Sequence, residues 1–141
     1  NFHYARRQWS LVDNGFLKYE WLNNFDNGMI ELAKKYKLDS QKDAENLWID
    51  EKKKIIAFER GGLLFAFNFH PSESQTNFWL PAHITGEGKY KAIFSTDEVN
   101  YGGQGRISED YEYYTQDDKK RGLGFEIYLP CRTAVVFKKQ K

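Results

Sequence analysis

The spacing of apolar residues changes near residue 52, and this change limits the folds open to the chain. Over residues 17–36 the apolar side chains recur every three or four positions, which predicts one helix with an apolar face. That face consists of Leu17, Trp21, Leu22, Phe25, Met29, Leu32, Ala33 and Tyr36. After Lys52 the period becomes two, as in strands. We expect a helix followed by a region rich in strands, with Asp13 or Asn14 capping the helix.

Short alternating segments separated by turn residues follow the helix. They predict strands at residues 55–59, 63–69, 75–80, 88–95, 125–129 and 133–138. Gly61 and Gly62 separate the first two and suit a tight hairpin. In the second strand the bulkier face is expected in the core; it holds Leu63, Phe65, Phe67 and Phe69. Six such strands predict a mainly β fold, an antiparallel β-sandwich or barrel, preceded by the amphipathic helix.

The segment 96–124 fits this scheme poorly, with only a weak strand pattern at residues 112–115. Loops of this length in compact domains are usually functional, packed on a partner or disordered. The four tyrosines of this segment argue against full disorder. Residues 117–121 are expected to form a solvated turn. The loop acids are expected to be solvated too, and not to form a catalytic pair: Asp97, Glu98, Glu109 and Asp110.

Composition narrows the classes of function. The chain has 21 Lys and Arg against 20 Asp and Glu, a net charge of +1, so no nucleic-acid partner is expected. No apolar run approaches the roughly 20 residues of a membrane-spanning helix, so no membrane partner is expected. The single cysteine, Cys131, cannot form an internal disulfide and suits a reducing, cytoplasmic location. Aromatic residues, at 17%, can build either a core or a sugar-binding surface.

No metal or cofactor site stands out in the sequence. The three histidines, His3, His70 and His83, lie far apart and are expected to be surface or capping residues. The glycine-rich stretches 86–88 and 102–105 lack the strand–loop–helix context of phosphate sites, so we expect turns there. Pattern and spacing therefore predict a helix and a β domain, and leave the function open.

Longer segments of the sequence carry information about the family. Five segments occur in this order: HYARRQWSLVDN (3–14), KYEWLNNFDNGM (18–29), IIAFERGGLLFAFNFHPSES (55–74), YGGQGR (101–106) and YLPCRTAVVF (128–137). Together they resemble the 1,4-α-glucan branching enzymes of the α-amylase superfamily. Cys131 stands where serine is usual and Gly61 where alanine is common, and residues 37–54 fit the family pattern poorly.

The resemblance implies a division of the chain. Residues 1–38 would be the last segment and terminal helix of a catalytic (β/α)₈ barrel, residues 39–54 a linker, and residues 55–141 a C-terminal all-β domain. The chain would then be a fragment of a glycosyltransferase that cleaves α-1,4 linkages and forms α-1,6 branches by a retaining mechanism. The catalytic carboxylates of such enzymes lie upstream of the matched segments. No residue here inherits their role, and the fragment alone is expected to be inactive.

Candidate contacts follow from the expected substrate, an α-glucan such as glycogen, amylose or amylopectin. Sugar rings stack on aromatic rings, and their hydroxyls bind polar side chains. The candidate glucan contacts are Trp79, Asn100, Tyr101, Arg106, Tyr111, Tyr113 and Tyr114. The candidates for facing the absent barrel, the second expected partner, are Tyr4, Arg6, Arg7 and Trp9. The β domain could equally serve only to stabilise that barrel.

Two alternatives stay open. One is a free-standing carbohydrate-binding module, although the YARRQW string at residues 4–9 would have no purpose in a module. The other is the C-terminal domain of a glucan debranching hydrolase, whose strands would show the same period. The helix must cover its apolar stripe in any of these proteins, so we expect it to pack on the sandwich or to self-associate.

Overall fold

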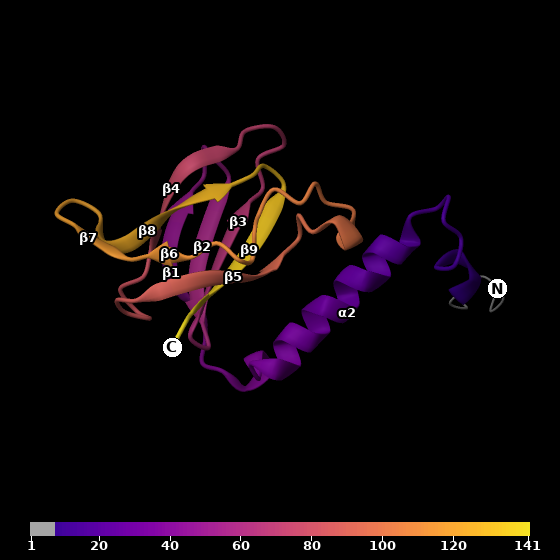
Figure 1. Cartoon of the computed structure of the whole chain (residues 1–141), viewed down its shortest axis with the longest axis horizontal. Coiled ribbons are helices and arrows are strands. Elements are labelled where there is room, and N and C mark those ends of the chain that lie inside the picture. Colours follow the sequence, from indigo (N-terminus) through magenta and orange to yellow (C-terminus); the bar gives the residue numbers. More distant parts are fainter. Residues whose placement is uncertain (1–7) are drawn as a thin grey trace.

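Two antiparallel sheets and one long helix make up the part of the chain that the computed structural model describes, residues 8–141 (Figure 1). The larger sheet has the order β1-β2-β3-β9-β5-β6 and the smaller one β4-β8-β7. The strands of the larger sheet are β1 (Glu45–Asp50), β2 (Ile55–Arg60), β3 (Leu63–Asn68), β9 (Thr133–Lys139), β5 (Lys89–Ser95) and β6 (Tyr113–Tyr114). Those of the smaller sheet are β4 (Gln75–Pro81), β8 (Gly122–Leu129) and β7 (Gln116–Asp118). The predicted antiparallel sandwich is confirmed.

The helix α2 (Tyr19–Lys35) runs along the outside of the larger sheet, away from the smaller one (Figure 1). Short 3₁₀ turns lie on either side of it, η1 (Trp9–Leu11) and η2 (Leu38–Ser40). The predicted packing of the helix on the sandwich is confirmed, because Phe25, Leu32 and Tyr36 contact the sheet. The other large members of the predicted stripe stay exposed: Leu17, Trp21, Leu22 and Met29. None of the described helices is both long and apolar enough to cross a membrane.

The main core lies between the two sheets. Strand β8 contributes one face to this core. Its residues Phe125, Ile127 and Leu129 are buried, and the residues between them are exposed. This alternation is the one expected from the sequence. Tyr90 of β5 stacks on Phe125 at a ring-centroid distance of 4.9 Å, and its hydroxyl donates to the carbonyl oxygen of Gly86.

A second apolar layer lies between the larger sheet and α2, where Leu63 and Phe65 of β3 are buried as expected. The bulky face of β3, with Leu63 and Phe65, packs under the helix and does not face the other sheet. The smaller residues Leu64 and Ala66 fill the space between the sheets. Both faces of β3 are buried. The alternation of the sequence shows that one face is bulkier than the other, but not which face the helix covers and which the second sheet covers. Phe69 lies beyond the strand with 62% of its surface exposed.

Two local predictions were wrong. Neither Asp13 nor Asn14 caps α2, which follows Lys18 in a left-handed conformation without a side-chain cap. The Asn14 Oδ1 atom instead accepts a hydrogen bond from the Phe16 amide in the preceding turn. The segment 39–54, expected only as a linker, contains the edge strand β1. Its register shifts between Asn46 and Trp48, and this irregularity breaks the alternation that marks the other strands.

The long segment 96–124 is largely ordered by short elements. It contains η3 (Val99–Tyr101) and the strands β6 and β7, and the weak pattern at residues 112–115 coincides with β6. The turn after β7 leads into β8 and forms a hairpin that projects from the sandwich on the side opposite to α2 (Figure 1). The Gly61–Gly62 hairpin is confirmed, with φ values of 61° and 79°.

Candidate functional site

The outer face of the smaller sheet gathers exposed aromatic and polar side chains. On β8 the buried residues point toward the other sheet, so Glu126 and Tyr128 point outward. Trp79 of β4 pairs with Glu126 in the register and therefore shares this outer face. Two grooves cross it. Asn77 is the lining residue that the two grooves share.

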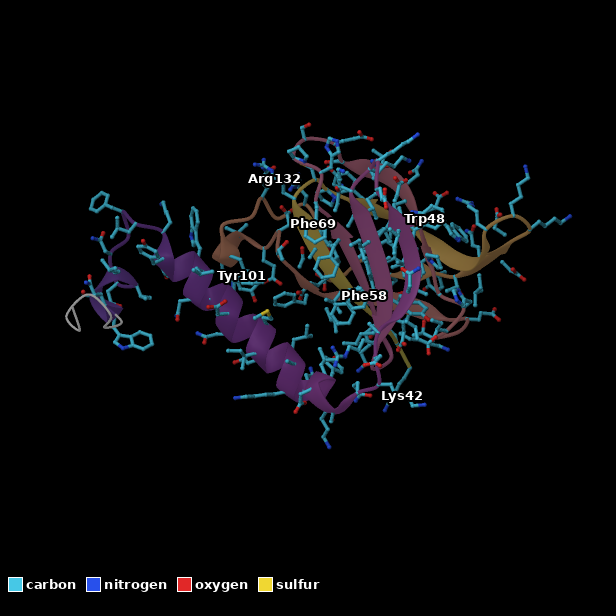
Figure 2. All side chains as sticks on the ribbon, turned by 180° about the vertical axis from the view of Figure 1, so that it is seen from behind. Lys42, Trp48, Phe58, Phe69, Tyr101 and Arg132 are labelled. Carbon is cyan, nitrogen blue, oxygen red and sulfur yellow. The ribbon has the colours of Figure 1, made fainter. Side chains whose placement is uncertain are left out.

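The first of these, which we call the tryptophan groove, has a volume of about 440 Å³. It opens where the edge strand β1 lies beside β4, with the β7–β8 turn at one end. Its lining includes Trp48, Asp50, Gln75, Asn77, Trp79 and Arg121. Trp48 lies on the side of the sandwich away from α2 (Figure 2) and exposes 47% of its surface.

Arg121 covers the candidate Trp79. Its Cζ atom lies 3.9 Å from the centre of the Trp79 ring system. Nη2 lies 3.3 Å from Asp118 Oδ2, and Nη1 lies 3.4 Å from Glu126 Oε1. The hydrogen bond with Asp118 raises the pKa of Arg121 above its ordinary value. The indole Nε1 of Trp79 is buried and has no hydrogen-bond partner within residues 8–141. Trp48 is therefore the more accessible of the two rings.

The second groove, which we call the tyrosine groove, has a volume of about 410 Å³ and brings three predicted contacts together. These are Tyr111, Tyr113 and Arg106, beside Asn77 and Tyr128. The Tyr111 and Tyr113 rings meet edge to face, with centroids 4.6 Å apart. Tyr111 is 61% exposed and can stack on a ligand, whereas Tyr113 packs on Phe125 and Phe137 of the core.

Tyr114, another predicted contact, lies in a neighbouring depression of about 330 Å³ that shares Tyr111, Tyr113 and Glu126 with the tyrosine groove. Its hydroxyl donates to Glu112 Oε2 at 2.8 Å. Glu112 also pairs with Lys89 at 3.0 Å, and this hydrogen bond is the main reason that the pKa of Glu112 is lowered. Four of the seven predicted glucan contacts therefore lie near one another beside Trp79.

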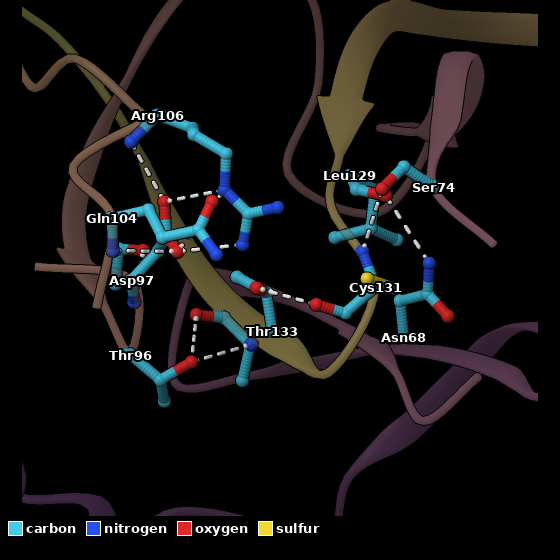
Figure 3. Close-up of polar contacts among 11 residues, drawn as sticks. Asn68, Ser74, Thr96, Asp97, Gln104, Arg106, Leu129, Cys131 and Thr133 are labelled. Atoms are coloured by element: carbon cyan, nitrogen blue, oxygen red, sulfur yellow. Dashed lines mark hydrogen bonds and ion pairs between the residues drawn. The ribbon is translucent and has the colours of Figure 1, made fainter. Parts of the chain in front are cut away.

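Arg106 is held by the buried Asp97 (Figure 3). The Arg106 Nη2 atom donates to Asp97 Oδ1, and its amide donates to Oδ2, each at 2.7 Å. The Gln104 amide donates to Oδ1 at 3.2 Å. Burial alone would raise the pKa of Asp97, but these hydrogen bonds outweigh it and hold the pKa below its ordinary value. The expectation of a solvated Asp97 was wrong, because the carboxylate is buried and accepts hydrogen bonds from Gln104 and Arg106 of the loop.

The other three loop acids lie nearer the surface. Burial, and next the charge of Glu109, raise the pKa of the half-buried Glu98. Glu109 and Asp110 are exposed, as expected. No group of three or more His, Cys, Asp or Glu side chains in residues 8–141 is arranged to hold a metal ion. His70 caps a turn, since its Nδ1 accepts from the amides of Ser72 and Glu73.

The two remaining glucan candidates lie on the other side of the sandwich. Tyr101 lies beside α2 (Figure 2), with its ring centroid 5.8 Å from Phe25 and 5.6 Å from Phe94. The Asn100 carbonyl oxygen accepts a hydrogen bond from Asn24 of the helix at 3.1 Å. These placements favour a packing role; a glucan contact by either residue stays a prediction.

The candidates for facing a barrel lie near the start of the chain. Tyr4, Arg6 and Arg7 fall outside the described residues. Trp9 lies in η1, is 63% exposed, and lines a groove of about 480 Å³ together with Leu22 and Ile30 of α2.

Sequence patterns missed Trp48, Arg121, Asn77 and Tyr128 as members of the grooved surface. Trp48 lies in the segment whose alternation is broken by an irregular register. Tyr128 was recognisable as an outward residue of β8, but the sequence does not show that Asn77 of β4 and the β7–β8 turn lie beside it.

Comparisons with known proteins agree with this picture. The family model described as "Alpha amylase, C-terminal all-beta domain" matches residues 48–140. The chain is 39% identical to the 1,4-alpha-glucan-branching enzyme of Rhizophagus irregularis over 96% of this chain and 20% of that protein. It is 39% identical to that of Candida glabrata over 99% of this chain and 20% of that protein. It is 33% identical to the chloroplastic/amyloplastic enzyme of Oryza sativa subsp. japonica, over 94% of this chain and 17% of that protein. The chain thus spans about a fifth of the length of the relatives that it matches.

Proposed function

Because this chain belongs to the family of α-amylase C-terminal all-β domains, we propose that it is the C-terminal part of a 1,4-α-glucan branching enzyme. The observation that carries the proposal is the 39% identity to branching enzymes over 96% and 99% of the chain, α2 included. The whole enzyme would cleave an α-1,4 linkage, keep the cut piece as a glycosyl-enzyme, and transfer it to a 6-hydroxyl. The catalytic carboxylates would lie outside this chain.

The first role of this chain in the enzyme is support of the catalytic domain. The exposed side of α2 carries Leu22 and Ile30, 57% and 45% exposed, beside Trp9. A contiguous group of exposed apolar side chains on the outer side of a helix marks a surface for a second partner. We propose that this partner is the catalytic domain that would precede this chain.

The second role is to contact the glucan substrate. The two grooves of the smaller sheet combine exposed aromatic rings with amide, carboxylate and guanidinium groups. Small-ligand sites combine apolar walls with a few polar groups in this way. Because the two grooves share Asn77, they suit a polymer such as glycogen, amylose or amylopectin. For the location of the enzyme we propose the cytoplasm, supported by the single cysteine.

The function is tested by adding amylose to the full-length protein that contains this chain, and in parallel to the 141-residue chain alone. We expect new α-1,6 linkages, measured as chains released by a debranching enzyme, with the full-length protein only. Release of linear chains from amylopectin by the full-length protein, without new branches in amylose, would favour a debranching hydrolase. Branching by the chain alone would contradict the assignment of catalysis to upstream residues.

A further inference from the structure

We propose that Trp48 is the sugar-stacking platform of a glucan subsite in the tryptophan groove, and that Arg121, held on Trp79, donates hydrogen bonds to the hydroxyls of the same ligand. The ligand is an α-1,4-linked glucan, and this choice rests on the proposed function. Trp79 then supports Arg121 and does not itself stack on the sugar.

The backbone of β1 directs Trp48 into the groove. Asn46 pairs with Phe58 and Trp48 with Ala57, so Leu47 is the extra residue of a bulge. Leu47 is buried in the core, and Ala57, the partner of Trp48, also faces the core side of the sheet. The bulge thus turns two consecutive side chains toward the same side of the sheet. Leu47 fills the core, while Trp48 reaches the open edge between the sheets and keeps 47% of its surface exposed.

The next residue of the strand points to the opposite face. Ile49 pairs with Ile56, which belongs to the face on which α2 packs, and Ile49 is 61% exposed. Trp48 and Ile49 are therefore neighbouring exposed apolar residues on the same edge strand, and only Trp48 lines the groove. This pair offers a matched control, because both substitutions remove exposed apolar surface from the same strand.

Arg121 is positioned as a donor before any ligand binds. The Trp79 ring lies against its guanidinium, and Asp118 and Glu126 hold its two terminal nitrogens. Asp118 is in turn fixed by accepting hydrogen bonds from the amides of Lys120 and Arg121 at 2.9 and 2.8 Å. An arginine has five N–H donors, so two ion pairs leave donors for a ligand. A guanidinium already held in place loses little freedom on binding.

The size and chemistry of the groove suit a short stretch of sugar chain. Its volume of about 440 Å³ lies toward the lower end of the roughly 300–1,000 Å³ of small-ligand sites. Asp50, Gln75 and Asn77 add acceptors and donors for hydroxyls around the Trp48 ring. Asn77 also borders the tyrosine groove, so a longer chain can continue toward Tyr111.

Nuclear magnetic resonance of the ¹⁵N-labelled chain tests the subsite directly. The four tryptophans give four indole N–H signals, and the signal absent in Trp48→Phe identifies Trp48. We expect maltoheptaose to shift the Trp48 signal saturably and to leave those of Trp9 and Trp21 in place, since Trp21 belongs to α2 and Trp9 lies beside that helix. Cellohexaose, the β-linked counterpart, is the control sugar and should shift none of them. An unmoved Trp48 signal under saturating maltoheptaose would overturn the proposal.

Variants separate this subsite from the rest of the surface. We expect Trp48→Ala to weaken maltoheptaose binding by about tenfold or more, and Ile49→Ala to leave it unchanged. Arg121→Lys keeps the charge but loses the planar contact with Trp79, so we expect weaker binding there too. Thermal melts check folding; should Trp48→Ala fail to fold, Trp48→Phe and the signal shifts of the unmodified chain still decide.

The failures are distinguishable. Equal affinity in Trp48→Ala and the unmodified chain would overturn the subsite, while branching by the full-length protein would still stand. A Trp48 signal that inorganic phosphate shifts and maltoheptaose does not would assign the groove to an anion, held by Lys53, Lys120 and Arg121, and would also overturn the proposal. Absence of branching activity in the full-length protein would contradict the proposed function. A Trp48 signal that responds to maltoheptaose would still support the subsite.

Discussion

The Tyr101 hydroxyl lies against the backbone of Gly28 in α2, where a Cβ atom would overlap it. The absence of a side chain at Gly28 lets η3 approach the helix, and the Tyr101 ring then fills the space between Phe25 and Phe94. About two turns earlier in α2 the roles are reversed, because the Trp21 ring of the helix lies against Gly102 of the loop. Glycine lowers the intrinsic stability of a helix. At position 28 it also allows the Tyr101 ring to pack between the helix and the sandwich.

Gly28→Ala tests this relationship. Alanine would favour an isolated helix by ~1 kcal/mol, but here we expect a net loss of about 1–3 kcal/mol in the free energy of unfolding, because Tyr101 must move. Urea denaturation measures the change. Gly15→Ala, at a glycine with no atom within 4 Å of the added Cβ, is the control and should change little.

A second substitution shows whether the hydroxyl is the cause. The double variant Gly28→Ala/Tyr101→Phe should recover part of the lost stability, because the overlapping oxygen is gone. A Gly28→Ala chain that is more stable than the original would contradict the predicted contact with Tyr101.

Asp97→Asn should destabilise the β domain and loosen the loop that carries Arg106. Removing one partner of a buried ion pair costs about 3–5 kcal/mol; we expect about 2–4 kcal/mol, because asparagine keeps part of the hydrogen bonding. Urea denaturation at pH 7 measures the loss. Asp110→Asn, at an exposed acid of the same segment, should leave the stability nearly unchanged.

The same carboxylate gives the stability of the chain a pH dependence of known sign. The folded-state pKa of Asp97 lies below its ordinary value, so the unfolded chain binds this proton more readily. The contribution is complete above the unfolded pKa of about 3.9 and disappears as the pH falls through the folded value. Comparing the unmodified chain with Asp97→Asn from pH 7 downward should show the gap in unfolding free energy closing at acid pH. A gap of constant size would contradict the lowered pKa.

Several features of the fold followed from the sequence because they depend on local pattern. The alternation of Phe125, Ile127 and Leu129 and the Gly61–Gly62 turn were sufficient to predict β8 and the β2–β3 hairpin. Which layer covers a two-sided strand such as β3 depends on where α2 lies, and no period within the strand encodes that. A bulge interrupts the alternation of inward and outward side chains, so the sequence pattern could not predict which way Trp48 points. A second register shift, between Ala92 and Phe94 of β5, places these two residues in different apolar layers.

The candidate site was predicted in part for a related reason. Aromatic residues of the loop pointed to Tyr111, Tyr113 and Tyr114, which do lie together, whereas Tyr101 has the same chemistry but packs under the helix. The partner of Trp79 could not be foreseen, because Arg121 reaches it only through the turn between β7 and β8. Sequence pattern identified residue types suited to sugar, and the tertiary fold decided which of them face solvent.

The outward side of α2 is predicted to matter only in the longer protein. Leu22→Asn should change the unfolding free energy of the 141-residue chain by less than about 0.5 kcal/mol, because Leu22 is 57% exposed. In the full-length protein it should cost about 1–3 kcal/mol if the catalytic domain buries this side chain. Thermal melts of both proteins measure the two effects. Equal effects in the two would contradict docking of the catalytic domain on this side of the helix.

The measurement that tests the account most directly is the migration of the folded 141-residue chain through native gels containing increasing concentrations of glycogen. A non-catalytic domain with a glucan-binding face should be retarded in proportion to the glycogen, and the retardation should fall sharply in Trp48→Ala and stay unchanged in Ile49→Ala. Migration that is the same at every glycogen concentration would contradict the account.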